Sequence, residues 1–101
     1  MKLKLSIKDK TIMTSAMRVR LSKLIAAQLN KYALNIRTVE LHIDDIESRQ
    51  HGIMKQCRIN LLLPGLPDIR LKAKGNNMLQ AIKRALQNSQ TLLAQKYAIS
   101  N

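Results

Sequence analysis

The sequence predicts an α+β two-layer sandwich, in which a four-stranded mixed sheet carries two helices on one face. Two kinds of segment predict it: some alternate apolar and polar residues, and others repeat apolar residues three and four positions apart. Their order is β-α-β-β-β-α. A β-α-β crossover makes its two strands parallel, and short links make the later strands antiparallel. The chain of 101 residues is expected to form one domain, 1–101.

The first third of the chain predicts a strand followed by a helix. Residues 1–8 place Leu or Ile on one face and mainly Lys on the other, as in a half-buried strand. Thr14 or Ser15 suits the N-cap of the helix, because a hydroxyl oxygen can accept a hydrogen bond from the first turn. The apolar stripe of this helix consists of Met17, Leu21, Leu24, Ile25, Leu29 and Tyr32.

Three further strands are predicted at residues 37–45, 53–63 and 68–74. The polar segment 47–52 ends in Gly and suits a hairpin loop. The segment "LPGLPD" turns the chain before the last strand, because Pro interrupts strand pairing and Gly accepts a positive φ. The residues expected to face the core are Val39, Leu41 and Ile43, then Ile53, Cys57, Ile59 and Leu61, then Ile69, Leu71 and Ala73.

The last segment changes from a strand period to a helix period at Gly75. Asn76 or Asn77 is the expected N-cap of the second helix. Its buried stripe is predicted to be Met78, Ile82, Ala85, Leu86, Ser89, Leu92 and Leu93.

Charge is the strongest indication of function. The chain has 18 Lys and Arg against six Asp and Glu, a net charge of +12. Four of the acids lie within residues 40–47, so the rest of the chain sets 18 basic residues against two acids, a net +16. Solubility needs a net charge of only about 2–8. A polyanionic partner is therefore expected.

The sequence indicates no enzyme, metal site or cofactor. His42 and His51 have no Cys or Glu at metal-binding spacing, and Cys57 falls on an inward face, where a packed thiol is expected. Glu40 and Asp44 would lie about 13 Å apart along a strand, too far to share one ion. No Gly-rich phosphate-binding loop is present, and no small-molecule substrate is expected.

The expected location is the cytoplasm. A single cysteine cannot form an internal disulfide, and the alternating N-terminus lacks the apolar run of an export signal. No segment approaches the roughly 20 apolar residues that a membrane-spanning helix needs, so no membrane partner is expected.

The small number of aromatic residues indicates which kind of nucleic acid the chain binds. Single-strand readers stack bases on aromatic side chains, and this chain has only Tyr32 and Tyr97. Tyr32 falls on the predicted core stripe. Lys and Arg contacts to the phosphates of a folded RNA, with little sequence preference, are expected instead.

Three segments together resemble the motifs of one family. "TSAMRVRL" (14–21) is similar to a Thr-x-Ala-Leu-Arg helix start, and "NIRTVELHID" resembles that family's second strand. "LLLPGLPDIRLKAKGNNMLQAI" resembles its Leu-Pro-Gly turn, fourth strand and the Gly-x-Asp-Met-Tyr-Ala-Ala-Ile-Asp entry to the last helix. The family is that of the ribosome hibernation promoting factors and ribosome-associated translation inhibitors. The matched positions are Gly75, Met78, Ala81 and Ile82, and the departures are Asn77, Leu79 and Lys83.

The resemblance implies a protein that docks on rRNA in the decoding channel of the small ribosomal subunit. There it would block mRNA and tRNA and hold ribosomes inactive, as part of a bacterial stress response. By this resemblance the chain is expected to be similar to the short form, without the C-terminal dimerisation domain of the long form, although it departs from short members in having no basic tail after "QKYAISN". A monomer is expected off the ribosome.

Two basic surfaces compete for the RNA. The open sheet face carries Lys residues but also Glu40, whereas the predicted helices contain no acid. The junction 74–77 is expected to add free N–H groups at a helix N-terminus, which favour phosphate. The RNA-binding residues are therefore predicted to be Arg20, Lys23, Lys74, Lys83 and Arg84, with Lys72 at the margin.

Two alternatives remain open from the sequence. One is a non-ribosomal double-stranded-RNA-binding module, since the β-β-β-α portion resembles that fold, although its Lys-Lys-x-Ala-Lys helix start is missing. The other is a protein-interaction adaptor that uses its basic surface on an acidic partner.

Overall fold

The computed structural model describes residues 1–7, 14–50 and 52–97. It confirms the predicted α+β architecture, with strands and α-helices in the order β-α-β-β-β-α and a short 3₁₀ helix inserted after α1. Lys8, predicted to end the first strand, and His51 lie outside the described residues. The elements are β1 (Lys2–Ile7), α1 (Ser15–Leu29), η1 (Asn30–Asn35), β2 (Thr38–Ser48), β3 (Gly52–Leu62), β4 (Ile69–Gly75) and α2 (Met78–Lys96).

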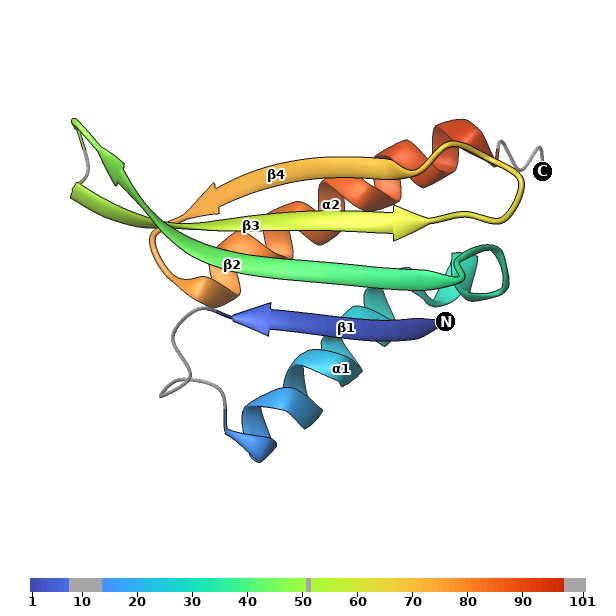
Figure 1. Cartoon of the computed structure of the whole chain (residues 1–101), viewed down its shortest axis with the longest axis horizontal. Helices are drawn as coiled ribbons and strands as arrows, with labels where there is room; N and C mark the ends of the chain where they lie inside the picture. Colours follow the sequence, from blue (N-terminus) through green and yellow to red (C-terminus); the bar gives the residue numbers. More distant parts are fainter. Residues whose placement is uncertain (8–13, 51, 98–101) are drawn as a thin grey trace.

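The four strands form one mixed sheet in the order β1-β2-β3-β4. β1 runs parallel to β2, as the crossover through α1 predicts, and the pairs β2–β3 and β3–β4 are antiparallel. Both α-helices lie behind this sheet in Figure 1, so the other face of the sheet is open. The molecule therefore has two broad surfaces, the solvent side of the helices and the open sheet face.

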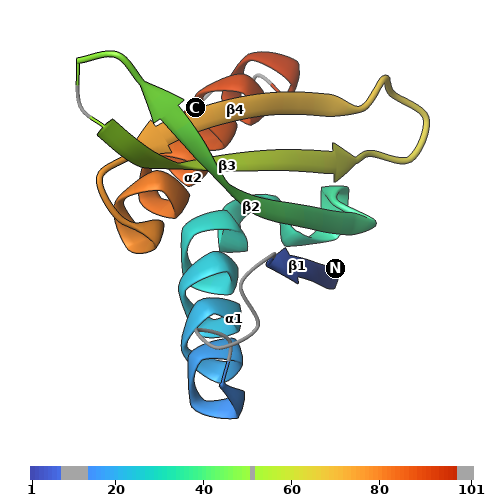
Figure 2. The ribbon, with the colours of Figure 1, turned by 60° about the vertical axis from the view of Figure 1, so that its left-hand side comes forward.

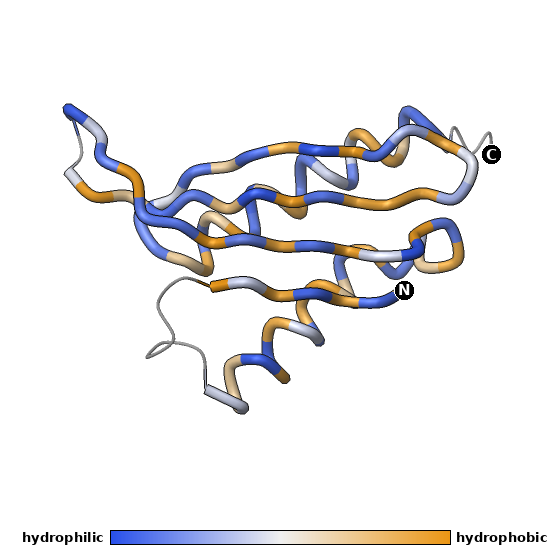
Figure 3. The backbone as a smooth tube through the Cα atoms, in the orientation of Figure 1, coloured by the Kyte–Doolittle hydropathy of each residue, from blue (hydrophilic) through white to orange (hydrophobic). Residues whose placement is uncertain are grey.

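The core lies between the sheet and the helices. Hydropathy alternates along the strands in Figure 3, and Val39, Leu41, Cys57 and Leu61 on the inward face are fully buried. From the helices, the same core receives Leu21, Ile25, Leu29, Met78, Ala81, Ile82, Ala85, Leu86, Ser89 and Leu93. Most of the predicted stripe residues are buried, because a two-layer fold hides one face of each element, whereas Met17, Leu24 and Leu92 are half-buried.

Side-chain caps decide where both helices begin. The Thr14 hydroxyl accepts a hydrogen bond from the Met17 N–H at 3.1 Å, and the Asn77 side-chain oxygen accepts one from the Gln80 N–H at 2.8 Å. Each cap satisfies an N–H that has no partner within its own helix. Of the paired alternatives in the sequence, Thr14 and Asn77 are thus the N-caps.

The structure corrects two expected boundaries and one expected core residue. α1 ends at Leu29, and Tyr32 is buried from the tighter helix η1. β2 continues to Ser48, because it pairs with β3 up to Gly52, so the predicted hairpin loop is much shorter. Ile53 was expected to face the core but is 69% exposed, because this hairpin extends past the registers of β1 and β4, as Figure 1 shows.

None of the described helices is both long and apolar enough to cross a membrane. α2 is the longest of them, and its outer face is polar and basic.

Candidate nucleic-acid interface

Four of the predicted RNA-binding residues lie on the solvent side of the helices. Arg20 and Lys23 project from α1, and Lys83 and Arg84 from α2, and all four are exposed. We call these four the helix-side group. Neither helix contains Asp or Glu. No carboxylate on the helices therefore competes with an incoming phosphate for these cations.

The two helices that carry the group are tied to each other. The Gln90 side-chain amide of α2 donates hydrogen bonds to the backbone oxygen of Gln28 and, at 2.8 Å, to its side-chain oxygen. Figure 2 shows that the C-terminal end of α1 passes close to α2, while the N-terminal turns of α1 extend beyond the sheet. The spacing between the two basic pairs is therefore set by packing and by this amide pair.

The junction between β4 and α2 fixes Arg84 against the end of the sheet. Arg84 Nη1 donates a hydrogen bond to the Lys74 carbonyl oxygen at 2.9 Å. Gly75 allows the close approach, because a Cβ at that position would lie 2.5 Å from the Ala81 backbone nitrogen. The backbone of Lys74 thus meets the helix side near the end of β4, whereas its exposed side chain lies on the open sheet face with those of Arg70 and Lys72.

The expectation of free N–H groups at this junction is wrong for two of them. The Gln80 N–H is bound by the Asn77 side chain, and the Asn76 N–H donates to Gln80 Oε1 at 2.7 Å. Reciprocal capping of this kind leaves fewer donors for a phosphate. Any attraction for RNA here therefore comes mainly from the Lys and Arg side chains.

The outer surface of α2 is hollowed beside this cap. A shallow depression of about 380 Å³ is lined by Asn77, Leu79, Gln80, Lys83, Arg84 and Gln87. Two of the four helix-side cations border it, and amide side chains supply further hydrogen-bond donors. Its composition suits a phosphodiester backbone, which is bound by Arg, Lys, Asn and Gln side chains.

Lys72 does not belong to this surface. In the β3–β4 register it lies opposite Arg58, on the open sheet face. The layer of strands separates it from the helix-side group. Its expected position at the margin of the RNA-facing surface is therefore corrected. The side chain of Lys74 lies on the same open face, two residues further along β4, and only its backbone carbonyl meets the helix side, through Arg84.

Cations on the open sheet face are dispersed and partly neutralised. Lys2 and Lys4 stand on β1, and two strands, β2 and β3, separate them from β4. Arg58 forms an ion pair with Asp44 at 2.8 Å, and Arg70 lies 3.9 Å from Asp68. Lys4 is opposite Glu40 in the β1–β2 register. This face therefore attracts a long polyanion less than the helix side does.

The candidate catalytic groups are placed as packing or surface residues. Cys57 is fully buried, and desolvation by burial raises the pKa of its thiol from 9.0 to about 12. A thiol held protonated is a poor nucleophile. No three His, Cys, Asp or Glu side chains gather in a metal-binding cluster within residues 1–7, 14–50 and 52–97.

A scan against protein-family models and a search of curated proteins found no match to this chain. What the chain does must therefore be inferred from its own residues, their burial and their charges.

Proposed function

We propose that this protein binds folded rRNA of the small ribosomal subunit in the cytoplasm and holds ribosomes inactive by occupying the decoding channel. The helix-side group carries the proposal: four exposed cations stand on two helices that contain no acid. Such a surface contacts phosphates without reading bases.

Two other features support a ribosomal target. The net charge of +12 on 101 residues is far above what solubility requires. The arrangement of strands and helices is the one expected from the motifs that resemble hibernation promoting factors. These features support the proposal that the chain is a short member of that family, a binding protein without catalysis that is monomeric off the ribosome.

Folded RNA is favoured over single-stranded RNA by the two Tyr rings. Their centroids are 6.3 Å apart, and Tyr32 is buried, so this ring is not available for stacking with bases. Neither ring lies on the strands of the open sheet face. A sheet-based stacking platform for single-stranded RNA is therefore not formed by the described aromatic residues.

Co-sedimentation with isolated small ribosomal subunits, next to a gel shift with plain duplex RNA, tests the proposal. We expect saturable sedimentation with subunits at concentrations at which duplex RNA is not shifted. Equal binding to both would favour the duplex-RNA module instead. Binding to neither, with capture of an acidic protein, would favour the adaptor.

Inhibition needs its own measurement, because binding alone does not block translation. Addition of the purified chain to a cell-free translation reaction should lower protein synthesis in proportion to subunit occupancy. Full occupancy with unchanged synthesis would contradict the inhibitory part of the proposal.

A further inference from the structure

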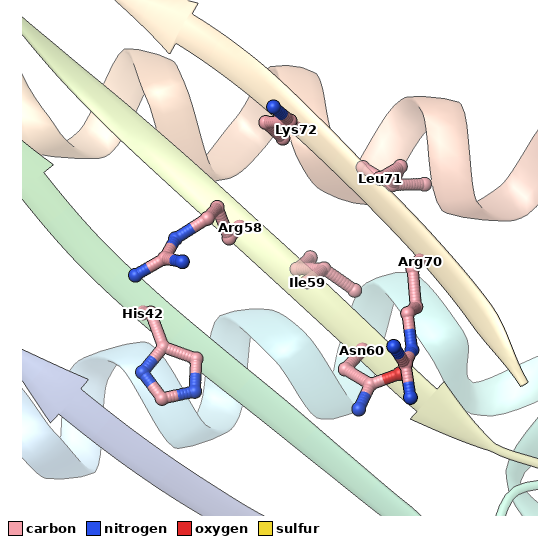
Figure 4. A pocket seen from close by; sticks show the side chains of 7 residues that line it. All are labelled: His42, Arg58, Ile59, Asn60, Arg70, Leu71 and Lys72. Carbon is pink, nitrogen blue, oxygen red and sulfur yellow. The ribbon is translucent and has the colours of Figure 1, made fainter.

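The open sheet face contains a hollow that the proposed RNA contact does not use. It measures about 660 Å³ and lies over β2, β3 and β4 (Figure 4). Small-molecule sites commonly measure about 300–1,000 Å³. Its polar side chains are His42, Arg58, Asn60, Arg70 and Lys72. We call this set the sheet hollow. The sheet separates it from the helix-side group.

Strand register gathers these residues from distant parts of the chain. His42, Arg58 and Lys72 are directly opposite one another across β2, β3 and β4, and Asn60 is opposite Arg70. Like charges directly opposite on one sheet face are destabilising. The ion pair of Arg58 with Asp44 offsets part of this repulsion between Arg58 and Lys72, and a bound anion would offset the rest.

The charge balance limits how negative that anion can be. Asp44 is paired with Arg58, and Asp68 lies near Arg70. Within residues 1–7, 14–50 and 52–97, Lys72 has no ion-pair or hydrogen-bond partner. A third carboxylate, Glu40, is directly opposite Asn60 and is balanced by Lys4 on β1. The three cations against Asp44 and Asp68 then leave about one positive charge, which suits a ligand with one or two negative charges. Arg58 uses one of its five N–H donors on Asp44 and keeps others for a ligand.

Asn60 adds a second requirement. Its side-chain oxygen is buried and has no hydrogen-bond partner. A buried acceptor without a partner costs about 1–3 kcal/mol, so a ligand whose N–H or O–H donor reaches this oxygen by displacing neighbouring side chains is favoured. In Figure 4 the Arg70 side chain extends beside Asn60, and the His42 ring lies beside Arg58. Sites for an anion and for a neutral donor thus adjoin one another.

We propose that the sheet hollow binds one nucleoside monophosphate unit, either a free mononucleotide or a single nucleotide of an RNA chain. The phosphate lies between Arg58 and Lys72, and a ribose hydroxyl or base N–H donates to Asn60. A nucleotide combines the two features that the hollow requires, a small negative charge and nearby hydrogen-bond donors. The inference does not depend on ribosome binding, because no helix-side residue takes part.

Calorimetric titration of the full chain with adenosine 5′-monophosphate and with inorganic phosphate tests it. We expect the nucleotide to bind about tenfold more tightly than phosphate, as one added hydrogen bond allows. The double variant R70A/K72A should weaken nucleotide binding by about tenfold or more. The matched control K2A/K4A removes the same charge from the same face outside the hollow and should bind like the wild type. Equal losses in both variants would overturn the proposal, because they would indicate general charge attraction.

A variant of Asn60 separates the nucleotide from the bare anion. Asn60→Leu keeps a similar volume and should weaken binding of the nucleotide by about tenfold while leaving phosphate binding unchanged. Unchanged nucleotide affinity in Asn60→Leu, with a wild-type melting temperature, would overturn the assignment.

A five-nucleotide RNA distinguishes the two sources of the ligand. If it binds, and R70A/K72A weakens it, while the mononucleotide does not bind, the proposal holds with RNA as the source. If neither probe binds, the proposal fails, and sedimentation with ribosomal subunits still tests the helix-side role independently.

Discussion

The two basic surfaces of this protein differ in what stands beside their cations. On the helix side, Arg20, Lys23, Lys83 and Arg84 are exposed on elements without a single carboxylate. On the open sheet face, Arg58 is paired with Asp44, and Arg70 lies near Asp68. The number of cations on each surface is therefore less informative than the number that remain unpaired.

This difference indicates two kinds of ligand. Unpaired cations spread over two helices suit many phosphates of a large RNA, each contact adding a similar amount. Partly neutralised cations grouped with His42 and Asn60 suit a small ligand of low charge.

Salt should weaken ribosome binding strongly and through the helix side. If about five phosphates are neutralised, the affinity should fall by roughly 10²–10³ between 50 and 200 mM salt. Lys83→Ala should reduce the slope by about one contact, and Lys72→Ala should leave it unchanged. Sedimentation at a series of salt concentrations measures this, and a flat response would exclude phosphate-led docking.

Gly75→Ala should destabilise the protein at the junction of β4 and α2, where the two surfaces meet. The added Cβ would lie 2.5 Å from the backbone nitrogen of Ala81, and backbone cannot give way as a side chain can. We expect a loss of about 3 kcal/mol in the free energy of unfolding. Urea denaturation measures it, with Asn76→Ala as an exposed neighbouring control. A loss no larger than in the control would show that α2 can shift freely.

Cys57 lies in the core between the sheet and the helices, and its contribution to the free energy of unfolding should depend on pH. Cys57→Ala should cost about 1 kcal/mol at neutral pH through a small cavity. Because burial raises the pKa of this thiol to about 12 in the folded chain, the unfolded chain releases its proton first as pH rises above 9.0. Wild-type stability should therefore fall between pH 9 and pH 12 by up to about 1.4 kcal/mol per pH unit.

The variant lacks this titration, so the stability advantage of the wild type should shrink above pH 9 and reverse at about pH 10 or above. Urea unfolding of both at neutral and alkaline pH compares them under identical titration of all other groups. A gap that is independent of pH would contradict the assignment of a buried, protonated thiol.

Asp44→Asn should produce the smallest change in stability and still sharpen the comparison. Its ion pair with Arg58 is partly exposed, with 30% and 51% of the two side chains accessible, so its loss should cost about 0.5 kcal/mol or less. The variant should bind adenosine 5′-monophosphate more tightly, because a competing carboxylate is removed. Helix-side RNA binding should not change.

Local patterns were enough to predict most of the fold. Alternation in residues 37–45 and the apolar stripe of the last helix depend on neighbouring positions, so both could be read from the sequence. The sheet hollow could not, because it depends on which residues of β2, β3 and β4 are opposite one another. The register between paired strands, which composition does not determine, places His42 opposite Arg58 and Arg58 opposite Lys72.

One error at the candidate site could have been avoided. Asn77 is followed three residues later by Gln80, a spacing typical of reciprocal helix capping. That pattern predicts occupied N–H groups at the start of α2, as the structure has them. The exposure of Ile53, at the free end of β2 and β3, could not be predicted in this way. Nothing in the residues around Ile53 indicates that the helices do not cover this end of the sheet.

Charge reversal on each surface tests the central claim most directly. Lys23→Glu with Lys83→Glu and, as the matched pair, Lys4→Glu with Arg70→Glu each change the net charge equally. Co-sedimentation with small ribosomal subunits should be abolished by the helix-side pair, with a melting temperature near that of the wild type, and retained by the sheet-face pair. Loss of sedimentation only in the sheet-face pair would contradict the assignment of the RNA-binding surface to the helices.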